Sequence, residues 1–156
     1  TIDMSLHYLP VAIPVTDARI TIIGGSEESI RKARRLARLI DQVTFISPVI
    51  PEEIRVLPFR FVKKEFDEED LKGVKILFVC TADKERNHRI KRIAEDRGIL
   101  TSVCDDREYC DFISPAICSN GNLSISVGSD GEDVRRSIRV RNRIRQLIDK
   151  GILDIT

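Results

Sequence analysis

Small and polar residues follow four short apolar stretches of the chain, at the points where we expect strands to end. They are, in chain order, Gly24, Gly25, Ser26, Ser47, Thr81 and Asp105. In an open parallel sheet, ligands bind beyond the carboxyl ends of the strands, close to the switch in strand order. The placement of these residues therefore predicts a nucleotide site, with the first five of them as cofactor contacts.

The first of these segments has part of the dinucleotide-binding fingerprint. That fingerprint needs one glycine for a tight turn, a second for close approach to pyrophosphate, and a small residue for helix packing. Gly24, Ser26 and Ser29 occupy these three positions. Ser26 carries a side chain where the phosphate would come closest, and Glu27 and Glu28 add carboxylates to the first helical turn. Two interpretations stay open: a cofactor-binding turn, and a strand-to-helix turn without a ligand.

The choice of cofactor depends on the residue that ends the second predicted strand. An acidic residue there holds the ribose hydroxyls of NAD, and an arginine accommodates the 2′-phosphate of NADP. This chain has Ser47, which can form one weaker hydrogen bond, and no basic residue follows it closely. The sequence therefore favours NAD over NADP.

The residues around the glycine turn follow a strand–helix–strand pattern. Residues 19–23 are a β-branched run, which is typical of a buried strand. Apolar residues recur at helical spacing over residues 27–39, and residues 43–46 form a second apolar run. This succession predicts one βαβ unit of about 30 residues.

The alternation continues along the next stretch of the chain. We predict a short strand at residues 59–62, a helical turn at 68–72 and a strongly apolar strand at 75–80. A helix over residues 83–97 and a strand over residues 100–104 follow. Alternating strands and helices predict an α/β fold of Rossmann type with a doubly wound parallel sheet.

The order of elements then changes. Residues 113–119 and 123–127 are predicted to form two strands around the turn Asn120-Gly121, which is a strong hairpin signal. A basic helix is predicted over residues 133–150.

This change in element order sets the predicted domain boundary. We assign a NAD-binding Rossmann domain to residues 1–112 and a small dimerisation segment, made of the β-hairpin and the basic helix, to residues 113–156.

Composition and charge exclude several classes of protein. The 156 residues are 42% hydrophobic and 33% charged, which is typical of a soluble globular chain, and the net charge of +1 argues against nucleic acid as a partner. No apolar run approaches the ~20 residues of a membrane span. Thr1–Leu9 lacks the basic start and apolar core of a signal peptide. We therefore expect a cytoplasmic protein that binds neither nucleic acid nor membrane.

The cysteines and histidines do not follow a metal-ligand pattern. Cys80, Cys104, Cys110 and Cys118 contain no CxxC pair, and we expect reduced thiols rather than a disulfide framework. Only two histidines are present, so we expect no metal site. His88 falls on the charged side of its predicted helix, where we expect it to be solvated.

Several stretches of the chain together resemble the precorrin-2 dehydrogenase domain of siroheme synthases. The most specific is Cys-Asp-Phe-Ile-Ser-Pro-Ala at residues 110–116, at the family's distance after Asp105-Asp106. The resemblance runs from about residue 7 to residue 150. The other matching stretches are Tyr8-Leu9-Pro10, Ile23-Gly24-Gly25, Arg31-Lys32-Ala33, Thr81 with Asn87, Arg97-Gly98-Ile99-Leu100, residues 121–127 and residues 141–144.

The resemblance implies a homodimeric oxidoreductase that uses NAD to convert precorrin-2, a tetrapyrrole, to sirohydrochlorin in siroheme biosynthesis. Some members of the family also insert iron, so a sirohydrochlorin ferrochelatase activity stays open. Asp105 matches the family's essential aspartate. By that match it is the expected catalytic residue, either as a general base or as a group that places the macrocycle.

A second function class also stays open: a catalytically reduced Rossmann module that senses a nucleotide or a tetrapyrrole. Ser26, Glu27 and Glu28 favour it, because the chain departs from the family pattern at this turn. The predicted basic helix likewise has more than one interpretation. We favour a dimer-forming helix with a solvated basic face. Its guanidinium groups would also suit the carboxylates of a tetrapyrrole.

Overall fold

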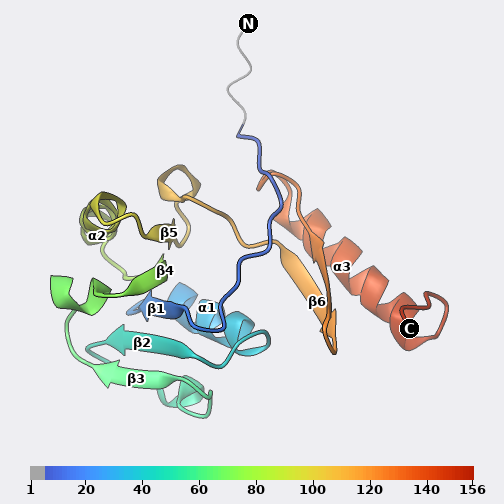
Figure 1. Ribbon diagram of the computed structural model, residues 1–156, viewed down its shortest axis with the longest axis horizontal. Coiled ribbons are helices and arrows are strands. Elements are labelled where there is room, and N and C mark those ends of the chain that lie inside the picture. Colours follow the sequence, from blue (N-terminus) through green and yellow to red (C-terminus); the bar gives the residue numbers. More distant parts are fainter. Residues whose placement is uncertain (1–5) are drawn as a thin grey trace, which may run out of the picture. The chain divides into compact units, whose positions relative to one another are not determined.

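The computed structural model describes residues 6–156 of the chain. They form two compact units, Ala12–Phe112 and residues 6–11 together with Ile113–Thr156 (Figure 1). The first five residues of Thr1–Leu9, the segment in which we expect no export signal, lie outside the described range.

The larger unit is built on a five-stranded parallel sheet with the order β3-β2-β1-β4-β5. β1 pairs with β2 on one side and with β4 on the other, so the strand order switches between β1 and β4. This arrangement confirms the predicted α/β fold of Rossmann type. The strands are β1 (Arg19–Ile23), β2 (Val43–Ser47), β3 (Arg60–Lys63), β4 (Val74–Val79) and β5 (Leu100–Val103).

Both helices of this unit begin at a polar residue. α1 (Glu27–Ala37) is capped by Ser26, whose hydroxyl accepts a hydrogen bond from the Ser29 amide at 3.3 Å. α2 (Lys84–Asp96) is capped by Asp83, whose carboxylate accepts a hydrogen bond from the Arg86 amide in the first turn. Three short 3₁₀ segments complete the unit: η1 (Glu52–Ile54), η2 (Glu68–Leu71) and η3 (Arg107–Tyr109).

Side chains alternate between the two faces of the sheet and build an apolar core on each. Phe78 of β4 belongs to the cluster that holds Ala33 of α1. Its neighbour Val79 belongs to the cluster that holds Ala94 of α2. α1 and α2 therefore cover opposite faces, which is the doubly wound arrangement that the sequence predicts.

The smaller unit contains an antiparallel hairpin, β6 (Ala116–Asn120) and β7 (Leu123–Val127), and the helix α3 (Val134–Asp149). The hairpin turn is Gly121-Asn122, one residue later than the predicted Asn120-Gly121, because Asn120 still pairs with Leu123; Gly121 has a φ of 59°. β6 begins later than predicted because Pro115 has no amide hydrogen to contribute to the ladder. The predicted hairpin and helix are confirmed.

The described N-terminal residues group with this smaller unit. The Tyr8 amide donates a hydrogen bond to Asp130 Oδ1 at 3.4 Å, and His7 Nδ1 lies 3.8 Å from Asp130 Oδ2. These contacts tie residues 6–11 to the segment between β7 and α3.

Over residues 6–156, no helix combines the length and the apolar character that crossing a membrane requires.

Candidate nucleotide and catalytic site

The carboxyl ends of the strands lie in register along one edge of the sheet. Ile23 pairs with Ile46 and with Val79, and Val79 pairs with Val103. The segments that follow β1, β2, β4 and β5 therefore leave the sheet from the same edge. All six residues expected at the site lie in these segments or at their start, with the strand switch between β1 and β4.

Gly24 makes the tight packing that the first fingerprint position requires. Its amide donates to the Ile46 carbonyl at 2.8 Å. A Cβ on Gly24 would lie 2.4 Å from Phe45 Cζ and 3.1 Å from Ser29 Oγ. Phe45 is completely buried, so its ring cannot move away without disturbing the core.

We expect Gly24→Ala to lower the free energy of unfolding by about 1–3 kcal/mol, because the added methyl group overpacks the core against Phe45. Urea unfolding measures the effect. Gly128→Ala is the matched control, since a Cβ added there would have nothing within 4 Å. Equal stability of the two variants would contradict the packing described for Gly24.

Ser26 stands at the second position of the fingerprint, and its hydroxyl forms a hydrogen bond within the protein. The hydroxyl donates to the Cys80 carbonyl at 2.7 Å, and the Ser26 amide donates to the same oxygen at 3.2 Å. Ser29 Oγ donates to the Ser26 carbonyl at 2.6 Å and accepts from the Gly25 amide at 3.3 Å. The two serines thus tie the start of α1 to the end of β4.

The two carboxylates in the first turn of α1 are paired on the helix surface. Glu28 forms an ion pair with Arg31, and Glu27 Oε2 lies 3.6 Å from Arg31 Nη2. The guanidinium group offsets much of their negative charge. They therefore oppose an anion at the helix N-terminus less than two unpaired carboxylates would.

Thr81, after β4, is held by the buried amide of Asn87. The Thr81 amide donates to Asn87 Oδ1 at 3.2 Å, and Asn87 Nδ2 donates to the Thr81 carbonyl at 3.1 Å. The two side chains are also hydrogen-bonded to each other. This mutual bonding fixes the loop that faces the glycine turn, since Thr81 Cα lies 3.9 Å from the Cβ position of Gly25.

Ser47 lies at the end of β2 and is buried. Its hydroxyl accepts a hydrogen bond from the Val49 amide at 3.4 Å, and its carbonyl accepts one from the Lys64 amide at 3.1 Å. Ser47 therefore orders the loop after β2, and its expected contact with a ribose stays a prediction.

Asp105 occupies an exposed turn directly after β5. Its φ of 60° lies in the left-handed region, which is uncommon for a residue other than glycine. Asp and Asn tolerate this region better than most residues, and strained backbone of this kind is enriched at functional sites.

Lys32 of α1 adds a cation beside Asp105 that the sequence does not single out. Its Nζ lies 4.9 Å from the centroid of the Phe78 ring. Burial lowers the pKa of Lys32 and the charge of Arg35 lowers it further, whereas Cys110 and Asp105 act to raise it. In the sequence, Lys32 stands out only as part of the stretch Arg31-Lys32-Ala33, because its electrostatic interaction with Asp105 arises from the fold.

We expect Lys32→Met to stabilise the fold at neutral pH, because the ammonium group loses hydration on folding. A pKa below 10.5 in the folded state means that the unfolded chain binds the proton more tightly. The advantage of the variant should therefore shrink as the pH rises from the lowered pKa toward 10.5. Thermal unfolding across pH measures it, with the exposed Lys63→Met as control. A constant or growing advantage would contradict the desolvation of Lys32.

His88 and Asp106 form a hydrogen-bonded pair, which bears on the predicted solvation of His88. His88 Nε2 lies 2.6 Å from Asp106 Oδ2, and the two side chains are only 18% and 16% exposed. The His88 ring also stacks on the Tyr109 ring, with centroids 3.6 Å apart. The expectation that His88 is solvated is wrong, because the segment after β5 covers that side of α2.

The cysteines require a second correction. Cys80 and Cys104 form a disulfide with their Cα atoms 5.1 Å apart, so the expectation of reduced thiols is wrong for these two. They follow Val79 and Val103, which pair in register, and this brings them together across 24 residues of sequence. Cys110 and Cys118 are free thiols, as expected.

Asp111 has a structural role that the sequence does not indicate, since it appears there only as part of the stretch 110–116. Its Oδ1 lies 2.6 Å from Nζ of Lys91, whose side chain is 7% exposed. Its Oδ2 accepts a hydrogen bond from the Thr101 amide at 2.9 Å. This ion pair joins α2, β5 and the segment after η3.

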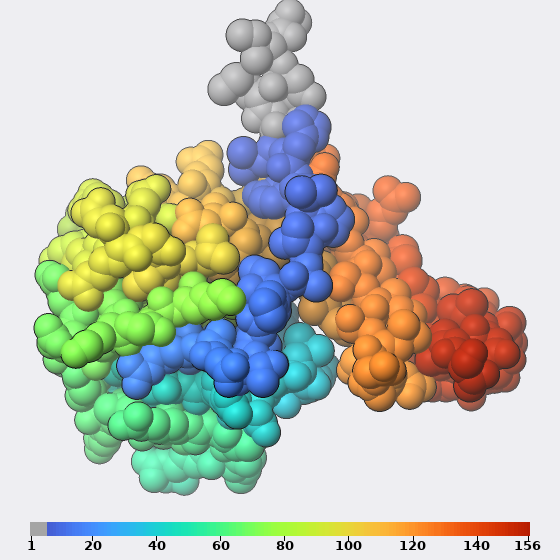
Figure 2. All heavy atoms as spheres, in the orientation of Figure 1, coloured from blue at the N-terminus to red at the C-terminus, as the bar shows by residue number. Residues whose placement is uncertain are grey.

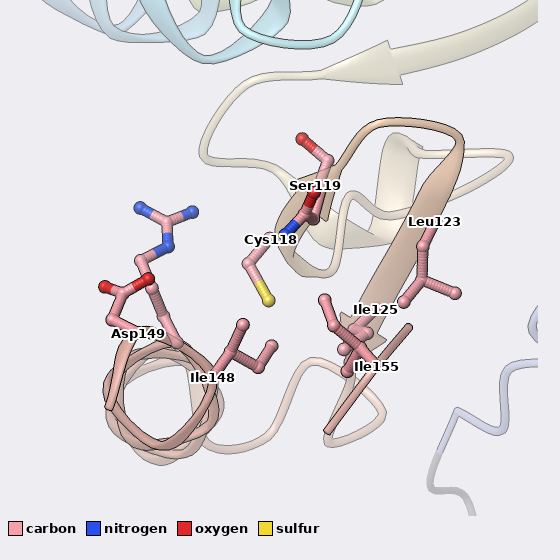
Figure 3. A pocket seen from close by; sticks show the side chains of 9 residues that line it. Cys118, Ser119, Leu123, Ile125, Ile148, Asp149 and Ile155 are labelled. Atoms are coloured by element: carbon pink, nitrogen blue, oxygen red, sulfur yellow. The ribbon is translucent and has the colours of Figure 1, made fainter. Parts of the chain in front are cut away.

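A separate hollow lies inside the smaller unit, between the hairpin and the end of α3. Figure 3 shows Cys118, Ile125, Ile148 and Ile155 around it. Its volume of about 90 Å³ is well below the ~300 Å³ at which ligand pockets begin. It therefore does not suit a dinucleotide. Among residues 6–156, no group of three or more His, Cys, Asp or Glu is placed to hold a metal ion.

A glycine turn at the strand switch of a doubly wound parallel sheet is the arrangement of a Rossmann-type domain. Residues 11–116 match the sequence profile of the family NAD_binding_7, described as "Putative NAD(P)-binding". The match covers more than half of the chain, so the chain belongs to this family.

Similar proteins share most of this chain. The siroheme synthase of Chromobacterium violaceum is 30% identical over 155 residues, which cover 94% of this chain and 32% of that protein. The siroheme synthase of Photorhabdus laumondii is 25% identical over 151 residues, with the same two coverages. This chain thus spans about a third of the length of these relatives.

A solved structure, "SirC, precorrin-2 dehydrogenase", matches with a TM-score of 0.77 and 21% identity. The match covers 89% of this chain and 70% of that one, and it shows that the fold is shared.

Proposed function

We propose that this chain oxidises precorrin-2 to sirohydrochlorin with NAD, in siroheme biosynthesis. The observation that carries the proposal is the exposed carboxylate of Asp105, which follows β5 at the same sheet edge as the Gly24–Ser26 turn. The family description supports a nicotinamide cofactor. The names of the similar proteins, siroheme synthase and precorrin-2 dehydrogenase, support the substrate.

The turn fits a dinucleotide. Gly25 is exposed and has a φ of 139°, so a ligand can approach its backbone. The Ser26 hydroxyl donates a hydrogen bond to the Cys80 carbonyl, so it already has a partner and does not require a phosphate as its acceptor. The N-terminus of α1 adds backbone amides and a favourable dipole for pyrophosphate. We therefore assign Gly24, Gly25, Ser26, Ser47 and Thr81 to the cofactor site.

Asp105 acts as the general base in this proposal. Conversion of precorrin-2 to sirohydrochlorin removes two protons and two electrons, and NAD, when bound, would accept one of the protons with both electrons as a hydride. The second hydrogen leaves as a proton, which the Asp105 carboxylate accepts and releases to solvent. Lys32 offsets the negative charge that Asp105 and a polycarboxylate substrate bring together.

The preference for NAD over NADP rests on the segment after β2. Ser47 and Pro48 provide no cation for a 2′-phosphate at this position. Calorimetric titrations with NAD and with NADP test the preference, and tighter binding of NADP would contradict it.

We also propose that the chain forms a homodimer through the hairpin and α3. Val134 and Val140 of α3 are large apolar residues with 61% and 40% of their surface exposed, and a second copy would cover them. Light scattering of the purified chain measures the oligomeric state, and a monomer at all concentrations would contradict this arrangement. We place the protein in the cytoplasm, where siroheme would be made.

A sensor without turnover is the second candidate, and the altered turn at Ser26 is the feature that favours it. Incubation of the chain with precorrin-2, with and without NAD, separates the two. NAD binding without sirohydrochlorin formation supports the sensor, whereas turnover excludes it. The same assay, extended with ferrous iron, tests the iron insertion that some family members perform.

A further inference from the structure

The backbone at Asp105 is held in a conformation that an isolated turn would seldom adopt. Its φ of 60° lies in the left-handed region, which few residues other than glycine, asparagine and aspartate adopt. Such strain persists only where the surroundings fix the backbone from several sides. The neighbouring Asp106 makes several contacts of this kind.

Asp106 is fixed through both its backbone and its side chain. Its amide donates to the Val103 carbonyl at 3.2 Å, and its carbonyl accepts from the Tyr109 amide at 3.0 Å and from the Cys110 thiol at 3.3 Å. Its carboxylate lies 2.6 Å from His88 Nε2 and 3.9 Å from Lys84 Nζ. All the backbone contacts are local, so the carboxylate provides the link to α2.

The link closes a ring of contacts between α2 and the segment after β5, which lie side by side in Figure 2. The Asp106 carboxylate is hydrogen-bonded to His88, and the His88 ring stacks on the Tyr109 ring with an interplanar angle of 7°. The Tyr109 amide then donates a hydrogen bond to the Asp106 carbonyl, which completes the ring. At 18% and 16% exposure, the pair is better shielded from water than an ordinary surface ion pair.

We propose that the His88–Asp106 pair is a positioning device that anchors the Asp105 turn to α2 and so directs the Asp105 carboxylate at its substrate. This inference rests on the proposed dehydrogenase function for its effect on turnover. It adds a role for two residues that do not themselves need to touch the substrate. A displacement of about 1 Å in a reacting group can cost on the order of 10²-fold in rate.

The test compares three variants on α2. His88→Ala removes both the hydrogen bond and the ring stack, and His88→Gln keeps an N–H donor that can reach Asp106. Arg86→Ala is the matched control, because it removes a different ion pair of the same helix, that with Glu65. We measure kcat and KM for NAD with precorrin-2, the melting temperature, and hydrogen exchange of residues 104–110.

We expect His88→Ala to lower kcat by about tenfold or more, with KM for NAD changed less than about twofold. Exchange of residues 104–110 should become faster while that of β1 and β4 stays as in the wild type. His88→Gln should recover most of both losses, and Arg86→Ala should show neither. If His88→Ala does not fold, Asp106→Asn replaces it, with a smaller loss, because the amide oxygen still accepts from Nε2.

Wild-type kcat in His88→Ala would overturn the proposal, as would an equal loss in Arg86→Ala. Hydrogen exchange gives an answer that does not depend on turnover. If the wild type itself does not oxidise precorrin-2, the proposed function fails. Unchanged exchange of residues 104–110 in His88→Ala then overturns the anchoring, and faster exchange supports it.

Discussion

Asp105→Asn should reduce the turnover of precorrin-2 by about 10²–10⁴-fold, the range that general acid–base catalysis contributes. The amide cannot accept the proton that the carboxylate accepts. Asparagine has nearly the same shape and tolerates a left-handed backbone at least as well, so the φ of 60° and the fold should be kept. Steady-state kinetics with NAD measures the loss.

The loss should appear in kcat rather than in cofactor affinity, because the cofactor contacts lie on the turns after β1, β2 and β4. Calorimetry should therefore show NAD binding within about twofold of the wild type. Asp41→Asn is the matched control, since Asp41 is an exposed carboxylate before β2, at the opposite end of the strands. Full activity of Asp105→Asn would remove Asp105 from the mechanism. An equal loss in Asp41→Asn would show that the effect is not specific to the site.

Asp111→Ala should cause the largest loss of stability, about 3–5 kcal/mol, because it leaves a buried ammonium group without its partner. The side chain of Lys91 is 7% exposed, with its Nζ 2.6 Å from Asp111 Oδ1. The substitution also removes the acceptor of the Thr101 amide at the start of β5. Urea unfolding followed by circular dichroism measures the change.

The double variant Lys91→Met with Asp111→Ala separates the effect of the unpaired charge from the effect of losing the hydrogen bond to the Thr101 amide. Without the ammonium group, loss of the carboxylate leaves no buried unpaired charge, so the double variant should be more stable than Asp111→Ala alone. If the loss in the double variant equals the sum of the losses in Lys91→Met and Asp111→Ala, the pair contributes no coupling energy.

The fold could be predicted because its signals are local. β-branched runs, helical spacing and the turn Asn120-Gly121 each depend on a few neighbouring residues, and the observed elements follow them within a few positions. The strand ends at Gly24, Thr81 and Asp105 followed from the same patterns, because parallel strands end at a common edge. The predicted α/β class and the hairpin with its helix are therefore confirmed.

The contacts within the site could not be predicted, because they join residues that are distant in the sequence. His88 and Asp106 are 18 residues apart, and Lys91 and Asp111 are 20 apart. In the sequence, His88 lies in a charged stretch that suggests a solvated surface, and Asp106 and Asp111 appear only as parts of the stretches that resemble the family. The disulfide Cys80–Cys104 depends on the register of β4 and β5, which no local pattern specifies.

Ser26 shows a different limit of the sequence pattern. A serine at a family glycine position suggests a weakened phosphate site, since a side chain stands where the ligand comes closest. In the fold, its hydroxyl caps α1 and donates to the Cys80 carbonyl at 2.7 Å. The effect of this serine on a phosphate site therefore depends on the direction of its side chain, which the sequence alone does not specify.

The most direct test is the stoichiometry of the proposed reaction under anaerobic conditions. The purified chain is mixed with precorrin-2 and NAD, and sirohydrochlorin and NADH are both quantified by their absorbance. We expect one NADH for each sirohydrochlorin formed, and no product when NAD is left out. Tight NAD binding with neither product would contradict the account and leave this chain a nucleotide-binding module.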